Sequence, residues 1–171
     1  MEMDFNTLVK QYQEPLYWHI RRLVVCHEDA RDILQETLLQ AWRSLHRLRE
    51  ERAVRGWLYK IATHLCYQHL NRHRKQPLST EDLSEVLIGR LESSSFVDYE
   101  QGEAILFQKA LLALTEQQRV VFTLRYYDEM SYEEIAEITR STTASLRVSY
   151  HHASQRIRDY LKTHCDYGEK F

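Results

Sequence analysis

Residues able to bind a metal gather in one stretch of the sequence. Cys66, His69 and His73 are spaced i, i+3 and i+7, which places them on one face of a helix, and His64 lies close by. Such a set could hold zinc and would fit a metal-dependent helical enzyme. No glutamate or aspartate accompanies these residues as a general base, however, and no HExxH sequence is present. We therefore expect no metal and no other cofactor.

A second stretch has the composition of a nucleic-acid-binding surface. Between Ser141 and Arg158 the sequence holds basic and polar residues but no acid. The phosphate-lined major groove of DNA favours such a surface, although a solvated face of an ordinary helical bundle is the alternative. On a helix, the outward positions would be Thr143, Ser145, Arg147, Ser149, His151, His152 and Arg156, with Arg140 just before them.

Other chemistry is missing from the sequence. No nucleophile–base set, phosphate-binding loop or dinucleotide fingerprint is present, so we do not expect an enzyme. The three cysteines contain no CxxC pair, and no stretch has the length of a membrane span or the apolar core of a signal peptide. These features indicate a cytoplasmic protein that does not insert into a membrane.

The composition predicts an all-α protein. Only 4 glycines and 2 prolines occur in 171 residues, while strong helix formers are abundant. The formal net charge is −2, but the charges are segregated along the chain. Basic residues dominate from Arg43 to Lys75, and acidic residues dominate from Gln76 to Gly102. This pattern predicts two small helical domains, residues 1–75 and 103–171, joined by an acidic flexible linker at 76–102.

The N-terminal domain is predicted to contain four helices. An apolar stripe from Phe5 to Tyr12 forms the first, and Pro15 opens the second. The third has an inner face at Ala30, Ile33, Leu34, Thr37, Leu38, Ala41, Trp42 and Leu45. A charged loop, His46 to Ala53, precedes a fourth helix from about Val54 to His73.

The C-terminal domain has the pattern of a helix-turn-helix. Thr115 with Gln118, and Ser131 with Glu134, have capping-box spacing and each begin a helix. The second of these is short, and a polar turn at Thr139–Thr142 separates it from a longer helix, Thr143–Leu161. A short supporting helix, a turn and a longer recognition helix are the elements of this DNA-binding motif.

Both domains resemble the extracytoplasmic-function (ECF) group of sigma-70 family RNA polymerase sigma factors. The N-terminal resemblance to region 2 rests on Asp29, Ala30, Asp32, Gln35, Glu36 and Thr37 and on the run from Gly56 to Ala62. The segment from Leu114 to Leu161 resembles region 4. The resemblance covers nearly the whole chain outside the linker and the last few residues, and regions 2 and 4 alone in a short chain are typical of the ECF group.

The resemblance implies a role for each surface. Region 2 would bind the clamp helices of core RNA polymerase through Asp32, Gln35 and Glu36. It would also melt the −10 element and hold a flipped base in the loop His46–Ala53. The −10 DNA-binding candidates are Arg49, Arg52, Arg55, Trp57, Tyr59, Lys60, Arg72, Arg74 and Lys75, of which Trp57 is also a candidate for the core. Region 4 would bind double-stranded −35 DNA through Arg140 and the outward residues named above.

Two features depart from the family pattern. Arg140 stands where the turn usually has glycine, and Arg147-Val148-Ser149 replaces the usual Lys-Ser-Arg run. Many relatives are held inactive by an anti-sigma factor that wedges between the domains, so the resemblance also implies such a partner, although nothing in the sequence itself requires one. The alternative is a helix-turn-helix regulator that is not a polymerase subunit, which would leave the Asp32/Gln35/Glu36 face and the basic fourth helix unexplained.

Overall fold

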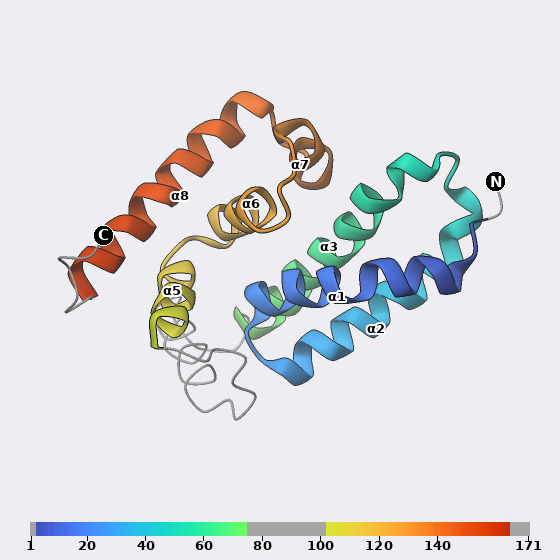
Figure 1. Ribbon diagram of the computed structural model, residues 1–171, viewed down its shortest axis with the longest axis horizontal. Coiled ribbons are helices and arrows are strands. Elements are labelled where there is room, and N and C mark those ends of the chain that lie inside the picture. The colour runs from blue at the N-terminus through green and yellow to red at the C-terminus, as the bar shows by residue number, and fades with distance from the viewer. Residues whose placement is uncertain (1–2, 75–101, 165–171) are drawn as a thin grey trace.

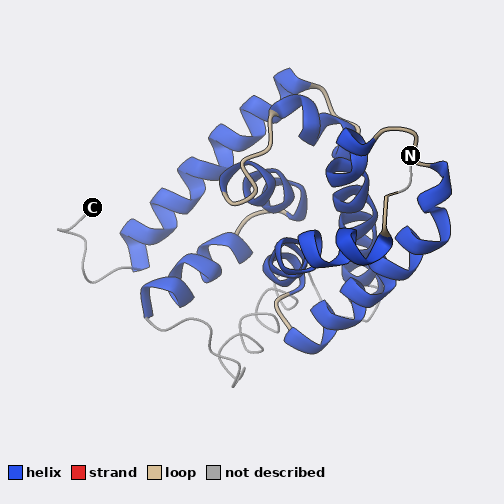
Figure 2. Cartoon of the chain, turned by 45° about the vertical axis from the view of Figure 1, so that its right-hand side comes forward, coloured by secondary structure: helices blue, strands red, loops and turns tan. Residues whose placement is uncertain are grey.

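The computed structural model describes residues 3–74 and 102–164, and these residues form helices and connecting turns without any strand. This confirms the all-α fold class. The helices α1 to α3 lie toward one end of the molecule with the N-terminus, and α5 to α8 lie toward the other (Figures 1 and 2). The elements are α1 (Phe5–Val24), α2 (His27–Ser44), η1 (Leu45–Arg47), η2 (Glu51–Ala53), α3 (Val54–Arg74), α5 (Gly102–Leu112), α6 (Glu116–Tyr126), α7 (Tyr132–Thr139) and α8 (Thr143–His164).

The prediction of two helices on either side of Pro15 is wrong. Helix α1 continues through Pro15, so the described part of the N-terminal domain has three long helices and two short 3₁₀ turns. Proline removes the hydrogen bond to the carbonyl four residues earlier, here that of Gln11. Both residues are exposed, so water can bond to this carbonyl, and the apolar side of the helix remains unbroken.

Both predicted capping boxes are present. Thr115 Oγ1 accepts a hydrogen bond from Gln118 N at 3.2 Å, while the Gln118 side chain accepts one from Thr115 N at 3.3 Å. Ser131 and Glu134 make the same reciprocal pair at 3.2 and 2.8 Å. These side chains satisfy amide groups that the first turns of α6 and α7 leave without helical partners.

The turn between α7 and α8 contains a strained residue. Arg140 has φ 55° and ψ 39°, the left-handed conformation that glycine adopts most easily. For a residue with a Cβ atom this costs on the order of 1 kcal/mol. The turn between α7 and α8 therefore has the backbone geometry of a glycine turn but carries an exposed cation, Arg140, at that position.

The two domains pack against each other through one apolar core. Leu58 and Ala62 of α3 belong to the same buried cluster as Val121 of α6 and Ile135 of α7. Helix α7 lies beside α3 in both views (Figures 1 and 2). A second, smaller cluster joins α5 and α6 to the inner face of α8. None of the described helices is long and apolar enough to cross a membrane.

Candidate nucleic-acid interface

From Thr143 to Arg158 the outer face of α8 carries no acid, and this part of the helix lies next to the turn. Leu146, Ala153 and Ile157 are buried and fix which face of the helix points inward. Most of the predicted −35 candidates therefore lie on the sides of the helix that face away from the core. Exposed among them are Arg140, Ser145, Arg147, His151, His152 and Arg156, whereas Thr143 and Ser149 are half-buried.

Neighbouring side chains position the two main cations of this surface. The guanidinium carbon of Arg147 lies 5.4 Å from the centre of the Tyr132 ring, within the range of a cation–π interaction. Arg156 Nη1 donates a hydrogen bond to Gln118 Oε1 at 3.1 Å, the same oxygen that caps α6. The first turn of α8 is capped by Thr142, whose hydroxyl accepts from Ser145 N at 3.2 Å.

Val148 was missed as part of this surface. Its side chain is 56% exposed, while the adjacent Ser149 is half-buried. The helical period could have predicted this exposure, since Val148 lies on the side of the helix opposite Leu146 and Ala153. The centre of the recognition helix therefore presents a branched apolar group, which suits contact with a thymine methyl rather than a phosphate.

The acidic and amide side chains expected to bind polymerase lie together on α2. Asp32, Gln35 and Glu36 are all exposed, as the i, i+3 and i+4 spacing requires. Gln40 extends this row by donating a hydrogen bond from Nε2 to Glu36 Oε1 at 3.1 Å. These side chains form a solvent-exposed, negatively charged strip that does not contribute to the core of the domain.

The cations of the N-terminal domain are dispersed over α3 and the turns before it. Arg49, Lys60 and Arg72 are exposed, and Arg52 pairs with Glu50 at 2.6 Å on the surface. Half-buried Trp57 lines a cleft that also includes Lys60 and, from the other domain, Ile138 and Arg140. The side chain of Arg74 and all of Lys75 lie outside the described residues.

Tyr59 does not face solvent as a DNA contact requires, and the half-buried side chain of Arg55 is bonded to the loop between α6 and α7. Tyr59 is 1% exposed, and its hydroxyl donates to Asp128 Oδ1 at 2.6 Å. Arg55 donates to the backbone carbonyl of Asp128 and has its Nη1 3.9 Å from Glu134 Oε1. In this arrangement Tyr59 therefore offers no surface to DNA, because its ring is buried and its hydroxyl is bonded to Asp128 in the loop between α6 and α7.

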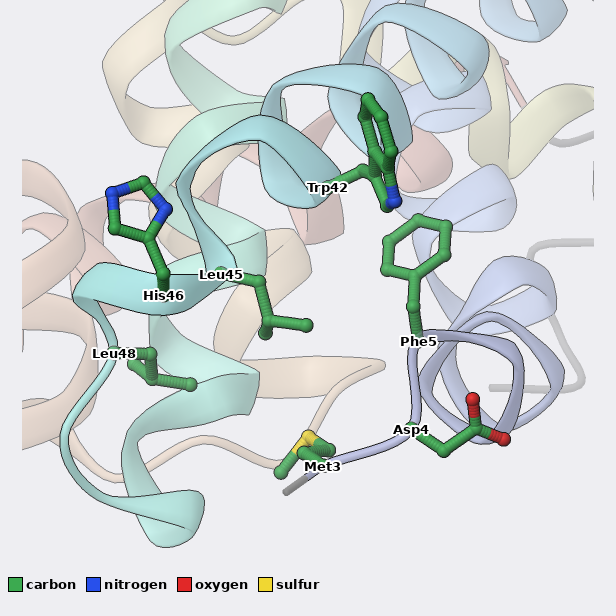
Figure 3. A pocket seen from close by; sticks show the side chains of 7 residues that line it. All are labelled: Met3, Asp4, Phe5, Trp42, Leu45, His46 and Leu48. Carbon is green, nitrogen blue, oxygen red and sulfur yellow. The ribbon is translucent and has the colours of Figure 1, made fainter. Parts of the chain in front are cut away.

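A cavity of about 590 Å³ lies beside the loop expected to hold a flipped base. It is formed where the start of α1 meets the end of α2 and η1, and Leu45 lies between the aromatic pair Phe5–Trp42 and His46 (Figure 3). Trp42 was expected in the core but is 62% exposed. It is the last apolar side chain of α2, two residues before the helix ends at Ser44. Trp42 and Phe5 were both missed as site residues.

His19 lies at the centre of the contact between the domains. Its Nε2 is 2.9 Å from Thr63 Oγ1, and its Nδ1 is 3.9 Å from Asp128 Oδ2. Neither Nδ1 nor Oδ2 has a hydrogen-bond partner among the described residues. Burial first, and then the charge of Arg22, lower the pKa of His19 from 6.5 to about 3. Burial raises the pKa of Asp128 above its ordinary value.

These shifts predict that acid destabilises the protein through His19. An unfolded histidine takes up a proton below its ordinary pKa of 6.5, whereas folded His19 remains neutral until about pH 3. The stabilisation that neutral His19 gives the folded state is therefore fully present above pH 6.5. Below pH 6.5 the free energy of unfolding decreases as the pH is lowered, by up to about 1.4 kcal/mol per pH unit. Asp128, with its raised pKa, acts in the opposite sense, so the total slope is smaller.

The contribution of His19 is isolated by comparison with His19→Gln, whose amide can keep the bond to Thr63 without titrating. Denaturant unfolding of both proteins between pH 5 and pH 7.5 should give a smaller pH dependence for the variant. Equal slopes for the two proteins would contradict a neutral, buried His19.

Two family models match the chain, Sigma-70 region 2 over residues 8–76 and Sigma-70, region 4 over residues 104–157. The ECF RNA polymerase sigma factor SigG of Mycobacterium tuberculosis is 28% identical over 94% of this chain, which spans only 48% of SigG. SigW of Bacillus subtilis is 27% identical over 92% of this chain and 89% of its own length. The sigma factor RpoE of Bartonella quintana, solved with the anti-sigma factor NepR, has a similar fold, with a TM-score of 0.75, 20% identity and coverage of 94% of this chain and 98% of that one.

Proposed function

The chain belongs to the sigma-70 family of RNA polymerase sigma factors, in its ECF group, and we propose that it binds core RNA polymerase and directs initiation at specific promoters. The observation that carries this proposal is the presence of three separate surfaces in one short chain. These are the outer face of α8 from Thr143 to Arg158, which holds no acid, the exposed acidic strip on α2, and the basic residues of α3 and the turns before it. A DNA-binding regulator that is not a polymerase subunit needs only the first.

Each domain has its own proposed role. Residues 1–75 act as region 2, residues 76–102 as a linker and residues 103–171 as region 4. Asp32, Gln35 and Glu36 bind the polymerase clamp helices. The exposed cations of the N-terminal domain bind −10 DNA, and the outer face of α8 binds the −35 duplex. Phosphate contacts by the cations supply affinity and register, while side chains that reach base edges supply specificity.

The cavity beside η1 gives the flipped −10 base a place to bind. Its aromatic walls, Phe5 and Trp42, have faces on which an unstacked base can pack, and His46 adds a hydrogen-bonding group at its edge. The exposed cations Arg49 and Arg52 follow directly in the chain and can bind the adjoining phosphates. Removing a base from the stack costs a few kcal/mol, and contacts of this kind offset that cost.

The remaining assignments follow from this role. The polymerase supplies the chemistry, so the chain itself is not an enzyme, and it acts in the cytoplasm where the polymerase works. An anti-sigma factor is a further proposed partner, supported by the complex in which the sigma factor RpoE has been solved with the anti-sigma factor NepR.

Run-off transcription with core polymerase on a library of −35/−10 sequences tests the proposal. We expect transcripts from a defined subset of templates and none without the protein. The double variant Asp32→Arg/Glu36→Arg should lose co-purification with core polymerase by about tenfold or more, because repulsion replaces attraction at the clamp. Glu14→Arg, a single charge reversal on the exposed side of α1, should not. A protein that binds DNA but never core polymerase would support the regulator instead.

A further inference from the structure

Two histidines and an aspartate converge where the first turn of α2 meets the last turns of α3. Each of Asp29, His69 and His73 offers one ligand atom, and these three atoms lie within 4.8 Å of one another. His69 Nε2 is 3.3 Å from Asp29 Oδ2, and the imidazole rings of His69 and His73 have centroids 4.5 Å apart. We propose that this cluster binds a divalent transition-metal ion of the zinc class.

The geometry of the cluster is close to that of a metal site. Histidines at i and i+4 share one face of a helix, which is a recurrent zinc-binding arrangement. Ligands bound tetrahedrally at 2.0–2.2 Å stand roughly 3.4 Å from each other. The His69–Asp29 pair already has this spacing, and the ligand atom of His73 lies within 4.8 Å of the other two.

The donor types select the class of ion. Two imidazole nitrogens and one carboxylate oxygen suit zinc, cobalt, nickel or copper, whereas magnesium and calcium prefer sites made of oxygen ligands. All three residues are half-buried, so the ligands are partly desolvated but remain reachable from solvent. Three protein ligands leave a fourth position for water, as in zinc sites that are not closed by the protein.

The site differs from the one that the sequence pattern indicates. Cys66 shares the helical face with His69 and His73, but it is 1% exposed and belongs to the apolar core. Asp29, which is distant in sequence and lies on another helix, takes its place beside the two histidines. A bound ion would therefore link α2 to α3, the two helices that carry the proposed polymerase-binding and −10-binding surfaces.

Titration of the full-length protein with Zn²⁺ alone tests the site. Calorimetry should show one ion bound per chain at this cluster, and Tm should rise by about 5–10 °C when free Zn²⁺ is near one hundred times Kd. Asp29→Asn and His73→Ala should each weaken binding by about tenfold or more. His64→Ala removes an exposed histidine from the same helix and should leave the affinity unchanged. Circular dichroism without metal establishes that each variant is folded.

Substitution with Co²⁺ identifies the ligands. A tetrahedral site of nitrogen and oxygen ligands should give visible d–d absorption without a near-ultraviolet thiolate band. A thiolate band that disappears in Cys66→Ala would assign the ion to Cys66 and overturn the role of Asp29. Equal Zn²⁺ affinity in the wild type, Asp29→Asn and His73→Ala would overturn the site altogether.

Discussion

Replacing Tyr59 with phenylalanine should weaken the packing of α6 and α7 on α3 by about 1.5–3 kcal/mol, the usual value of a hydrogen bond to a charged group. The hydroxyl of Tyr59 is the donor to Asp128 Oδ1, at 2.6 Å, and Asp128 Oδ2 has no hydrogen-bond partner among the described residues. The variant would leave a buried carboxylate without either bond. The effect should appear as a lower Tm and as faster amide exchange in α3 and α7.

The same substitution should strengthen binding to −10 DNA. Arg55 is a candidate phosphate contact, but in this arrangement it donates to the carbonyl of Asp128 and lies near Glu134, so part of its donor capacity is used within the protein. If the domains separate on a promoter, a weaker contact between them lowers the cost of that separation. The gain in affinity for a melted −10 oligonucleotide cannot exceed the packing free energy that the substitution removes. The affinity should therefore rise by at most about 10- to 150-fold.

The control is Tyr126→Phe, which removes a hydroxyl from a ring that is 55% exposed on α6. Neither Tm nor DNA affinity should change appreciably in this protein. A Tyr59→Phe variant with lowered stability and unaltered −10 affinity would mean that the closed packing does not compete with DNA. Unaltered stability would contradict the importance of the Tyr59–Asp128 bond itself.

The sequence could predict those elements that are set by residues a few positions apart. Thr115 with Gln118 and Ser131 with Glu134 satisfy helix N-termini within three residues, so the beginnings of α6 and α7 follow from spacing alone. The inner face of α8 follows equally from its 3.6-residue period. Local patterns of this kind are sufficient to predict the helix-turn-helix and most of its outer surface.

Features that depend on tertiary contacts could not be predicted in this way. Pro15 marks a helix start in sequence, but an exposed position lets the helix continue through it. Trp42 fits the apolar stripe of α2 and is nevertheless exposed, since the chain turns away just after it. The pairings of Tyr59 with Asp128 and of His69 with Asp29 join residues from different helices, and no local pattern contains them.

Replacing Arg147 with alanine should lower affinity for the proper −35 duplex by about 5- to 150-fold, the 1–3 kcal/mol expected for a well-placed contact to a base. Arg147 is exposed on the outer face of α8, where the ring of Tyr132 restricts its side chain at 5.4 Å. It precedes the exposed Val148, so no second cation is adjacent to replace it. Lys10→Ala, which removes a charge from the exposed side of α1, is the control and should bind normally.

The pattern of the loss distinguishes two roles for Arg147. If it contacts a base edge, the variant should discriminate less between the proper −35 sequence and a sequence changed at one position, while its affinity for unrelated DNA is preserved. If it contacts only phosphate, affinity should fall uniformly, and the slope of log K against log salt should become shallower by about 0.9. Because the exposed neighbour of Arg147 is the apolar Val148, which suits contact with a base rather than with a phosphate, we expect the first result. Full −35 affinity in Arg147→Ala would remove α8 from the proposed interface.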